Sequence, residues 1–361
     1  MTITAPLHDV DVIVVGLHLR WRGVWQRPNH IISRLASTWP VIVLEEPLPA
    51  DADGVETHTA GNVTVVTPRR HEPAEPADEA SIEYLRELIG RRRPLIWLYT
   101  PMMLALADAF PDAPLVYDKM DELAAFAFAD PRLRNREDAL LARADQVFTG
   151  GASLQRSVLP RAPRAACYPS GVDADHFGRA SSLAAHEALA PYRGGPIFMY
   201  VGVVDERIDL ELIAALADHR PDATIAMVGP VVKIDPHTLP QRGNIVYLGM
   251  RGYDELPALL AAADVALMPF ARNEHTANIS PTKTLEYLAA GLRVVSTAIP
   301  DVVADYTGIV DIAHDIPQFL AYVDGDAPPD DSRTQRARAK VAAGSWDGIA
   351  AAMRQMLGAA V

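Results

Sequence analysis

A lysine and a glutamate three positions apart could bind an anionic ligand. Lys283 and Glu286 lie in the run Ile-Ser-Pro-Thr-Lys-Thr-Leu-Glu-Tyr at 279–287, which follows a short apolar segment and a polar loop. Ser280 can cap a helix here, and Pro281 suits its first turn. A helix N-terminus attracts anions, and the lysine adds a full positive charge. The run predicts an anion site whose glutamate could accept hydrogen bonds from ribose hydroxyls, with a capped helix bearing a surface Lys–Glu pair as the alternative.

A second cation follows the apolar segment 197–201. Gly202 allows the backbone to approach a ligand closely, and Arg207 stands just before the next expected helix. A guanidinium group can bind a phosphate with two hydrogen bonds, although Arg207 could instead pair with Glu206 or Glu211 on the surface. Two cations at the carboxyl ends of strands would suit a diphosphate leaving group, because its charge grows as its bond to carbon breaks.

Acidic residues end the apolar segment 115–117 in the first half of the chain. Asp118 or Asp121 could hold an acceptor hydroxyl or act as a general base. The alternative is structural: Asp121 would cap the next helix, and Asp118 would pair with Lys119 or Arg134.

Arginine, tryptophan and histidine gather in the loop after the first apolar segment. Such side chains suit a sugar ring or an anionic acceptor such as a lipid-linked phosphate, and the loop could touch a lipid-borne substrate at a membrane surface. An amphipathic loop packed on the edge of a helix is the alternative. His30 is expected to be structural, and His176 is expected to be a turn residue behind Asp173. The residues of the loop are His18, Arg20, Trp21, Arg22, Trp25 and Arg27, of which His18, Trp25 and Arg27 are the acceptor-site candidates.

Short apolar segments alternate with segments of helical period along most of the chain, which predicts parallel sheets with crossover helices. The expected strands are 12–15, 41–44, 63–66, 95–99, 115–117, 147–149, 197–201, 224–228, 245–248, 265–268 and 294–296. Residues 51–76 are expected to be a surface segment that contains one strand.

We therefore predict an α/β chain with two doubly wound, Rossmann-like domains. The first covers 1–182 and is completed by a C-terminal helix over 344–358, and the second covers 195–343. The linker is expected within 181–195, which contains proline and two glycines. Ligands of such sheets bind beyond the carboxyl ends of the strands, so a cleft between the domains is expected.

Composition narrows the function classes. The 361 residues carry 33 basic and 46 acidic side chains, a net charge of -13, which disfavours a general nucleic-acid binder. The single Cys167 excludes a disulfide framework and a cysteine-based zinc site. No apolar run is long enough to span a membrane, and the N-terminus lacks the basic region of a signal peptide, so a cytoplasmic protein is expected. The turn after Gly16 lacks the dinucleotide-binding glycine pattern, and no P-loop motif occurs.

The motifs taken together resemble the GT-B glycosyltransferases, most closely the retaining family-4-type enzymes that build bacterial cell-surface glycans. The resemblance covers nearly the whole chain, and its motifs keep their order and spacing. It rests on Gly202 with Arg207 and on the segments 24–30, 168–177, 227–230, 244–249, 253–257 and 280–291.

This resemblance implies a GT-B fold in which the C-terminal domain holds a nucleotide-diphosphate sugar. By it, Arg207 and Lys283 bind the diphosphate, Glu286 binds the ribose, and the segment 249–253 holds the base. No metal or other cofactor is implied, and the acceptor is a glycan or a lipid-linked hydroxyl. The donor-site candidates it supplies in addition are Gly16, Gly202, Gly229, Arg251, Tyr253, Asn278, Ser280, Pro281 and Thr282.

One position departs from the family pattern. Many of these enzymes have two glutamates separated by seven residues, and Asn278 stands where the first would be. We read the chain as a transferase that acts with retention in surface-glycan or glycolipid synthesis, in the cytoplasm or at the inner face of the membrane. The alternatives are a non-hydrolysing nucleotide-sugar epimerase and a GT-B binding subunit without turnover.

Overall fold

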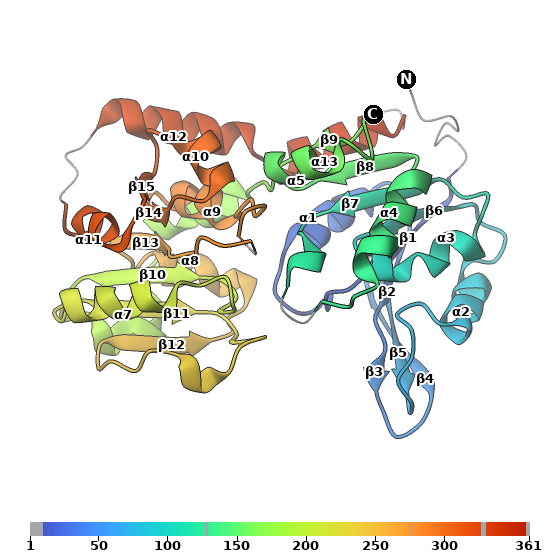
Figure 1. Ribbon diagram of the computed structural model, residues 1–361, viewed down its shortest axis with the longest axis horizontal. Helices are drawn as coiled ribbons and strands as arrows, with labels where there is room; N and C mark the ends of the chain where they lie inside the picture. Colours follow the sequence, from blue (N-terminus) through green and yellow to red (C-terminus); the bar gives the residue numbers. More distant parts are fainter. Residues whose placement is uncertain (1–9, 127–128, 275, 326–329, 359–361) are drawn as a thin grey trace. The chain divides into compact units, whose positions relative to one another are not determined.

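The computed structural model describes residues 10–126, 129–274, 276–325 and 330–358. The chain divides into two compact units, one formed by Met1–Pro169 with Trp346–Val361 and the other by Ser170–Ser345 (Figure 1). Both units are α/β with parallel sheets, which confirms the predicted fold class. Every apolar segment expected to be a strand forms one.

The first unit is built on a nine-stranded sheet with the order β3-β5-β2-β1-β6-β7-β8-β9, and β4 pairs with β5. All the pairings are parallel except β4 with β5. The strands are β1 (Val12–Leu17), β2 (Val41–Glu45), β3 (Leu48–Pro49), β4 (Gly54–Ala60), β5 (Val63–Arg70), β6 (Pro94–Leu98), β7 (Leu115–Lys119), β8 (Gln146–Thr149) and β9 (Ala166–Cys167). The helices are α1 (Arg27–Leu35), α2 (Glu79–Ile89), α3 (Ala105–Ala109), α4 (Leu133–Arg143), α5 (Ala152–Val158) and α13 (Trp346–Met356).

The central strand β1 is buried on both faces, since its side chains alternate between two apolar layers. Ile13 and Val15 join the layer that contains α1 and the C-terminal helix α13, whose Trp346 is 1% exposed. Val12 and Val14 join the opposite layer, which is covered by α2 and α4. The last helix of the chain is thus part of the core of the first unit.

The second unit has a six-stranded, all-parallel sheet with the order β12-β11-β10-β13-β14-β15. Its strands are β10 (Ile197–Val201), β11 (Thr224–Val228), β12 (Ile245–Gly249), β13 (Val265–Met268), β14 (Arg293–Thr297) and β15 (Asp311–Ala313). Its helices are α6 (Ala174–Gly178), α7 (Leu210–His219), α8 (Leu256–Leu260), α9 (Lys283–Ala289), α10 (Pro300–Tyr306), α11 (Ile316–Asp324) and α12 (Asp331–Ala343). One apolar core holds the sheet and its helices together.

The division between the units falls earlier than the predicted linker at 181–195. Val172, Phe177 and Leu189 are buried in the core of the second unit, together with the strand residue Ile197. Residues 170–195 therefore belong to the second unit, because apolar anchors bind them to it despite their proline and glycine content.

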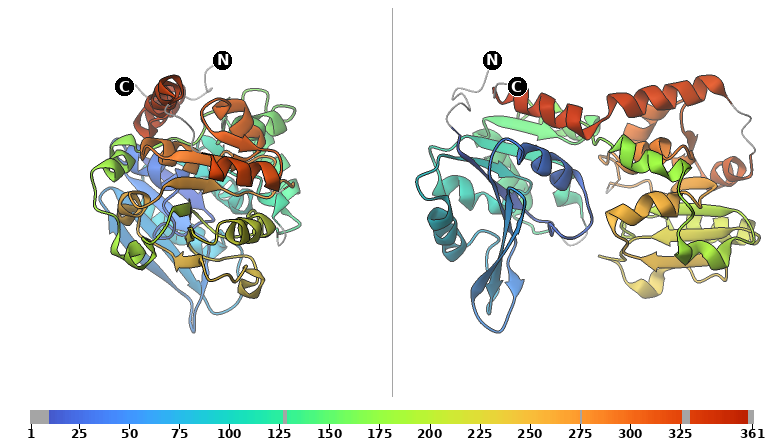
Figure 2. Two further views of the ribbon diagram at one scale, coloured as in Figure 1. Left: turned by 90° about the vertical axis from the view of Figure 1, so that its left-hand side faces the viewer. Right: turned by 180° about the vertical axis from the view of Figure 1, so that it is seen from behind.

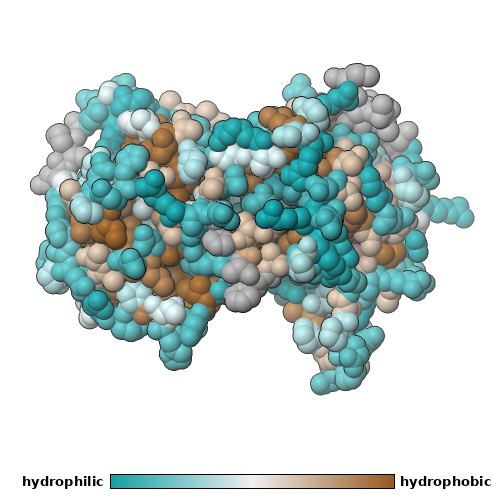
Figure 3. All heavy atoms as spheres, viewed as in Figure 1, coloured by the Kyte–Doolittle hydropathy of each residue, from teal (hydrophilic) through white to brown (hydrophobic). Residues whose placement is uncertain are grey.

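Within the described residues, no helix is long and apolar enough to cross a membrane. The face seen in Figure 3 is mainly hydrophilic, with apolar patches between polar side chains. The large apolar side chains that are exposed come from different elements, as expected for an ordinary protein surface; they are Leu159, Val232, Met250, Val303 and Met356.

Candidate functional site

Two glycines bring the carboxyl ends of β10 and β11 into close contact. A Cβ atom added to Gly229 would lie 1.8 Å from the carbonyl oxygen of Gly202. A Cβ added to Gly202 would lie 2.6 Å from the hydroxyl of Tyr200. The amide of Gly202 donates to Val228 O at 2.8 Å, and that of Gly229 to Gly249 O at 2.9 Å. Neither glycine can carry a side chain, so bare backbone lines the edge of the sheet where ligands of such sheets bind.

Arg207 lies in the loop that leaves β10, and this loop is bonded to the segment leaving the adjacent strand β13. Ala271 N donates to Arg207 O at 2.8 Å, and Asp209 N donates to Pro269 O at 2.9 Å. The arginine is consequently fixed beside the loop that leads to Lys283.

The guanidinium group of Arg207 binds Asp205, a partner that was not considered from the sequence. Its Nε and Nη2 atoms lie 2.9 and 2.7 Å from the carboxylate oxygens of Asp205. Asp205 is 2% exposed and also accepts from the Arg207 amide at 3.0 Å, whereas the Arg207 side chain is 21% exposed. Sequence reasoning missed Asp205, although its position two residues before Arg207 fits a local side-chain-to-backbone bond.

Helix α9 begins at Lys283, and the prediction that Ser280 caps it with Pro281 in its first turn is wrong. Thr282 is the residue at the N-cap, and it makes no capping bond with its side chain. Thr284 N donates to Pro281 O at 3.3 Å, three residues back, so a tighter turn precedes the helix.

Lys283 and Glu286 form the pair that the sequence offered as an alternative, but the glutamate is not on the surface. Lys283 Nζ lies 3.0 Å from Glu286 Oε2, and the two side chains are 18% and 3% exposed. The next residue, Tyr287, accepts a hydrogen bond from Val201 N at 2.8 Å, which ties α9 to the end of β10. A nearly buried carboxylate thus orients an ammonium group at the carboxyl edge of the sheet.

The loop between β13 and α9 contains the other donor-site candidates, Asn278, Ser280, Pro281 and Thr282, all half-buried. Thr276 organises this loop: it is buried, and its hydroxyl donates to Ala271 O at 2.5 Å. No sequence pattern points to this threonine, because a hydroxyl in a polar loop has no periodicity.

Tyr253 follows β12 and stacks on His176 of α6. The ring centroids are 4.3 Å apart with an interplanar angle of 8°, and His176 Nε2 lies 3.0 Å from Tyr253 O. The histidine expected to be a turn residue is therefore helical and packs against a donor-site candidate. Arg251 lies nearby, with Nη1 3.8 Å from Glu255 Oε1.

In the first unit, Arg27 and Asp118 are brought together as a buried ion pair. Arg27 Nε lies 3.0 and 3.2 Å from the two carboxylate oxygens, and its Nη1 donates to Tyr168 O at 2.6 Å. The two residues are 2% and 0% exposed, so neither offers a group to an acceptor as predicted. Burial, reinforced by the charge of Asp118, raises the pKa of Tyr99 well above its ordinary value.

The partners expected for Asp118 are also wrong, because Lys119 is engaged elsewhere. Its ammonium is buried, 2.9 Å from Glu122 and 2.5 Å from Glu137. Asp121 is half-buried two residues beyond β7, and the short helix that follows has Glu122, not Asp121, at its N-cap.

Two further candidates, Gly16 and Trp25, make packing contacts in the first unit. A Cβ on Gly16 would lie 2.8 Å from Leu98 Cδ2, so the glycine is explained by strand packing. Trp25 Nε1 donates to His30 Nδ1 at 3.3 Å, and His18 is half-buried in the same loop.

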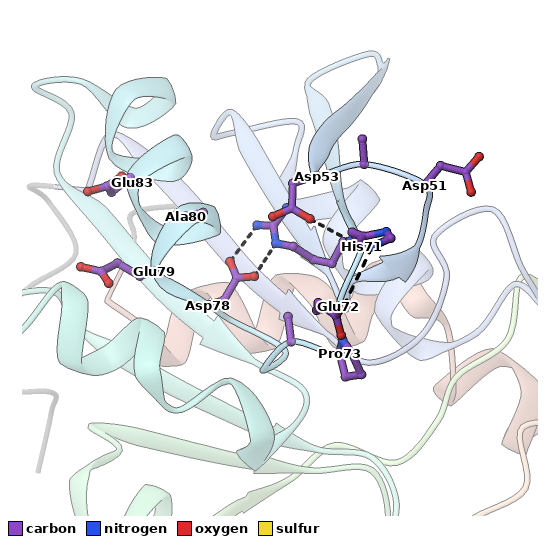
Figure 4. A pocket seen from close by; sticks show the side chains of 12 residues that line it. Asp51, Asp53, His71, Glu72, Pro73, Asp78, Glu79, Ala80 and Glu83 are labelled. Atoms are coloured by element: carbon purple, nitrogen blue, oxygen red, sulfur yellow. Dashed lines mark hydrogen bonds and ion pairs between the residues drawn. The ribbon is translucent and has the colours of Figure 1, made fainter.

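An acidic pocket of about 890 Å³ lies in the first unit, away from every predicted site residue (Figure 4). Arg70 lines this pocket, and its Nε and Nη2 atoms donate to the two carboxylate oxygens of Asp78 at 2.6 and 2.8 Å. The carboxylates that line it belong to Asp51, Asp53, Glu72, Asp78, Glu79 and Glu83. Among the described residues, no three His, Cys, Asp or Glu side chains are grouped so as to hold a metal ion.

Residues 195–324 match the sequence model of the family described as glycosyl transferases group 1. The C-terminal unit is a group 1 glycosyltransferase domain. The chain is also 23% identical over 251 residues to the putative teichuronic acid biosynthesis glycosyltransferase TuaH of Bacillus subtilis. That alignment covers 65% of this chain and 61% of the relative, less than two thirds of its length.

Solved structures extend the fold assignment to both units of this glycosyltransferase-like chain. The sucrose-phosphate synthase of Thermosynechococcus elongatus has a TM-score of 0.74 at 16% identity, over 96% of this chain and 98% of that one. A UDP-forming α,α-trehalose-phosphate synthase from Burkholderia xenovorans, in complex with glucose-6-phosphate, has a TM-score of 0.69 at 14% identity, over 96% and 100%. The fold is GT-B, as the sequence motifs predicted.

Proposed function

We propose that this chain transfers a sugar from a nucleotide-diphosphate donor to an acceptor hydroxyl, with retention, in the assembly of a surface glycan or glycolipid. One observation carries the proposal: within a group 1 glycosyltransferase domain, Arg207 and Lys283 follow the adjacent strands β10 and β13, each held by a buried carboxylate. The names of TuaH and of the UDP-forming synthase support a sugar donor of this class.

The two cations would act on the leaving group. As the bond from the sugar to the diphosphate breaks, negative charge grows on the phosphate oxygens, and positive groups already in place stabilise it without reorganising. Asp205 and Glu286 supply that preorganisation, since each holds its cation before substrate arrives. An ammonium has three donors, and Lys283 gives one to Glu286, so it can keep this bond while it binds a phosphate.

Residues at the same edge of the sheet would make the remaining contacts with the sugar donor. The bare backbone at Gly202 and Gly229 would let the diphosphate approach closely, and Glu286 would accept from ribose hydroxyls. The segment from Gly249 to Tyr253 would hold the base, steadied by the stacking of His176. Asn278 would face the transferred sugar and help to select which sugar donor binds.

The acceptor would bind to the first unit. His18 and Trp25 lie in the loop after β1, and Asp121 is a half-buried carboxylate two residues beyond β7, outside the buried Arg27–Asp118 pair. A lipid-linked acceptor would bring the enzyme to the inner face of the membrane. No metal takes part in this scheme, because the two cations provide the positive charge.

The test uses the purified chain with UDP-, GDP- and ADP-sugars, measured by thermal shift and by release of the nucleoside diphosphate. We expect one donor class to raise the unfolding temperature and to be turned over with an acceptor, and Lys283→Met to weaken both effects strongly. Arg242→Met is the matched control, because Arg242 also pairs with a carboxylate (Asp218, 2.6 Å) but precedes β12 at the opposite end of the strands. Binding without turnover, or reversible inversion at C2 of the sugar, would refute the transferase proposal.

A further inference from the structure

Strand β4 leaves one edge of the first unit's sheet unpaired within the described part of the chain. It pairs with β5 in an unbroken one-to-one register from Gly54–Arg69 to Ala60–Val63, and no described strand lies on its other side. Six of its seven residues are exposed. Figures 1 and 2 show this hairpin projecting from the rest of the first unit.

The edge lacks most of the features that normally prevent a strand from pairing with another chain, and its one acidic side chain, Glu56, is paired with Arg69 of β5 at 2.7 Å. Natural edge strands are short, bulged or covered, or carry lysine or proline. Strand β4 reads Gly-Val-Glu-Thr-His-Thr-Ala, with neither lysine nor proline, and its register contains no bulge. A regular, open edge of this length is a template for a further strand.

The register fixes which backbone groups of β4 face outward. Val41 N donates to Asn62 O, so the even-numbered residues of β5 point their backbone groups toward β2 and the odd-numbered ones toward β4. Pro68, which has no N–H, is even-numbered and therefore leaves the β4 ladder intact. On β4 itself, Gly54, Glu56, His58 and Ala60 bond to β5, whereas Val55, Thr57 and Thr59 direct N–H and C=O away from the sheet.

Pairing of the β4 sequence with its own reverse places the Glu56 carboxylate opposite the His58 imidazole. If two copies pair antiparallel about Thr57, this threonine faces its own equivalent, and Val55 faces the partner's Thr59. Glu56 then lies opposite the partner's His58, and the reciprocal pair forms on the other side of the axis. These are the non-hydrogen-bonded positions, where cross-strand side chains come closest. The hydrogen-bonding positions fall at the residues whose backbone groups are unpaired.

We propose that two copies of this chain associate through β4 around a two-fold axis at Thr57, which joins their sheets into one. The backbone N–H and C=O groups of Val55, Thr57 and Thr59 form the hydrogen bonds between the two strands. The two Glu56–His58 contacts set the register and exclude a parallel arrangement. One pair of polar strands makes a small interface, so the dimer dissociates on dilution.

The first test needs no variant. Sedimentation velocity over a dilution series should show a monomer–dimer equilibrium. Hydrogen exchange of the backbone amides should then separate the two sides of the strand. We expect the amides of Val55, Thr57 and Thr59 to gain protection as concentration rises, while those of Glu56 and His58, bonded to β5, stay protected throughout. A monomer at every concentration, or protection that does not follow this alternation, would overturn the proposal.

The second test removes one outward amide. Thr57→Pro deletes an N–H that β5 does not use, and should raise the dimer dissociation constant at least about tenfold. Thr57→Val keeps the amide and serves as the control. His58→Glu should also dissociate the dimer by opposing two glutamates, and the exchange Glu56→His with His58→Glu should restore it. A dimer unaffected by Thr57→Pro, in a variant with the unfolding curve of the wild type, refutes the interface.

Discussion

Arg27 and Asp118 are 91 positions apart in sequence and form a buried ion pair in the first unit. The arginine is the first residue of α1 and the aspartate belongs to β7, so the pair links a helix to the sheet beneath it. Arg27 also donates to the backbone of Tyr168, at the end of the first unit's long segment. Two residues that the sequence suggested for an acceptor site therefore connect α1 to β7 inside this unit.

Removing the charge of Asp118 should destabilise the first unit strongly. Asp118→Asn leaves the Arg27 guanidinium buried without a counter-charge, and we expect a loss of about 3–5 kcal/mol in the free energy of unfolding. Urea denaturation followed by tryptophan fluorescence measures it, because all five tryptophans lie in the first unit. Asp108→Asn is the control: its pair with Arg143 is exposed (2.7 Å), so the loss should stay below about 1 kcal/mol. Equal losses would contradict the structural role.

Trp346 should be the main anchor of the C-terminal helix. Its ring is 1% exposed and stacks on His30 with centroids 4.6 Å apart. Trp346→Ala should cost about 3–5 kcal/mol of unfolding free energy and leave α13 open to proteolysis. Met356→Ala, at an exposed position of the same helix, should leave both unchanged. Limited proteolysis with urea denaturation checks the pair, and a resistant Trp346→Ala helix would show that other contacts suffice.

Lys283 should contribute to activity and to stability by separable routes. Lys283→Met removes the charge facing the leaving group, so kcat/KM for the donor should fall by on the order of 10²-fold. It also leaves the Glu286 carboxylate, 3% exposed, without its partner, which lowers stability. Adding Glu286→Gln should recover stability but not activity. Steady-state kinetics beside thermal unfolding distinguishes the two, and recovered turnover in the double variant would exclude the proposed role.

Gly229 should tolerate no side chain. Its φ is 145°, and a Cβ would collide with the carbonyl of Gly202 at 1.8 Å. We expect Gly229→Ala to cost at least about 1–3 kcal/mol and to weaken donor binding, since the carboxyl ends of β10 and β11 must separate. At Gly243 a Cβ meets nothing within 4 Å, so Gly243→Ala should be nearly neutral. Chemical denaturation of both variants decides the point; similar stabilities would mean that the strand ends shift easily.

Acid should remove a defined contribution to the stability of the second unit. The hydrogen bond from Arg220 lowers the pKa of Asp222 to about 2. A carboxyl whose pKa is depressed on folding stabilises the fold above its unfolded value, near roughly 4, and this contribution disappears as pH falls toward the folded value.

Asp222→Asn should therefore unfold at a lower temperature than the wild type at neutral pH, and the difference should vanish by about pH 2. Because the pair is exposed, added salt should reduce the difference as well. Far-UV circular dichroism is the suitable probe, since the tryptophans report only on the first unit. A difference independent of both pH and salt would point to packing rather than charge.

The amino-acid sequence by itself determined the architecture and the resemblance to the GT-B glycosyltransferases. Runs such as Val12–Val15 and Ile197–Val201 are apolar on both faces, which is typical of a parallel strand covered on both sides. Glycine, arginine and lysine recur at the strand ends with the spacing of the GT-B enzymes. These properties are local, because each depends only on residues that are close together in sequence.

The tertiary structure alone decided which charged groups meet. Nothing near Asp118 in sequence identifies Arg27 as its partner, and nothing local indicates that Glu286 is buried or that His176 lies against Tyr253. Strand β4 escaped notice for a related reason: its residues are polar on both faces, so no apolar alternation marks it. Periodicity records burial against a core, whereas pairing between distant side chains depends on how strands and helices cross in three dimensions, and no short stretch of sequence contains that information.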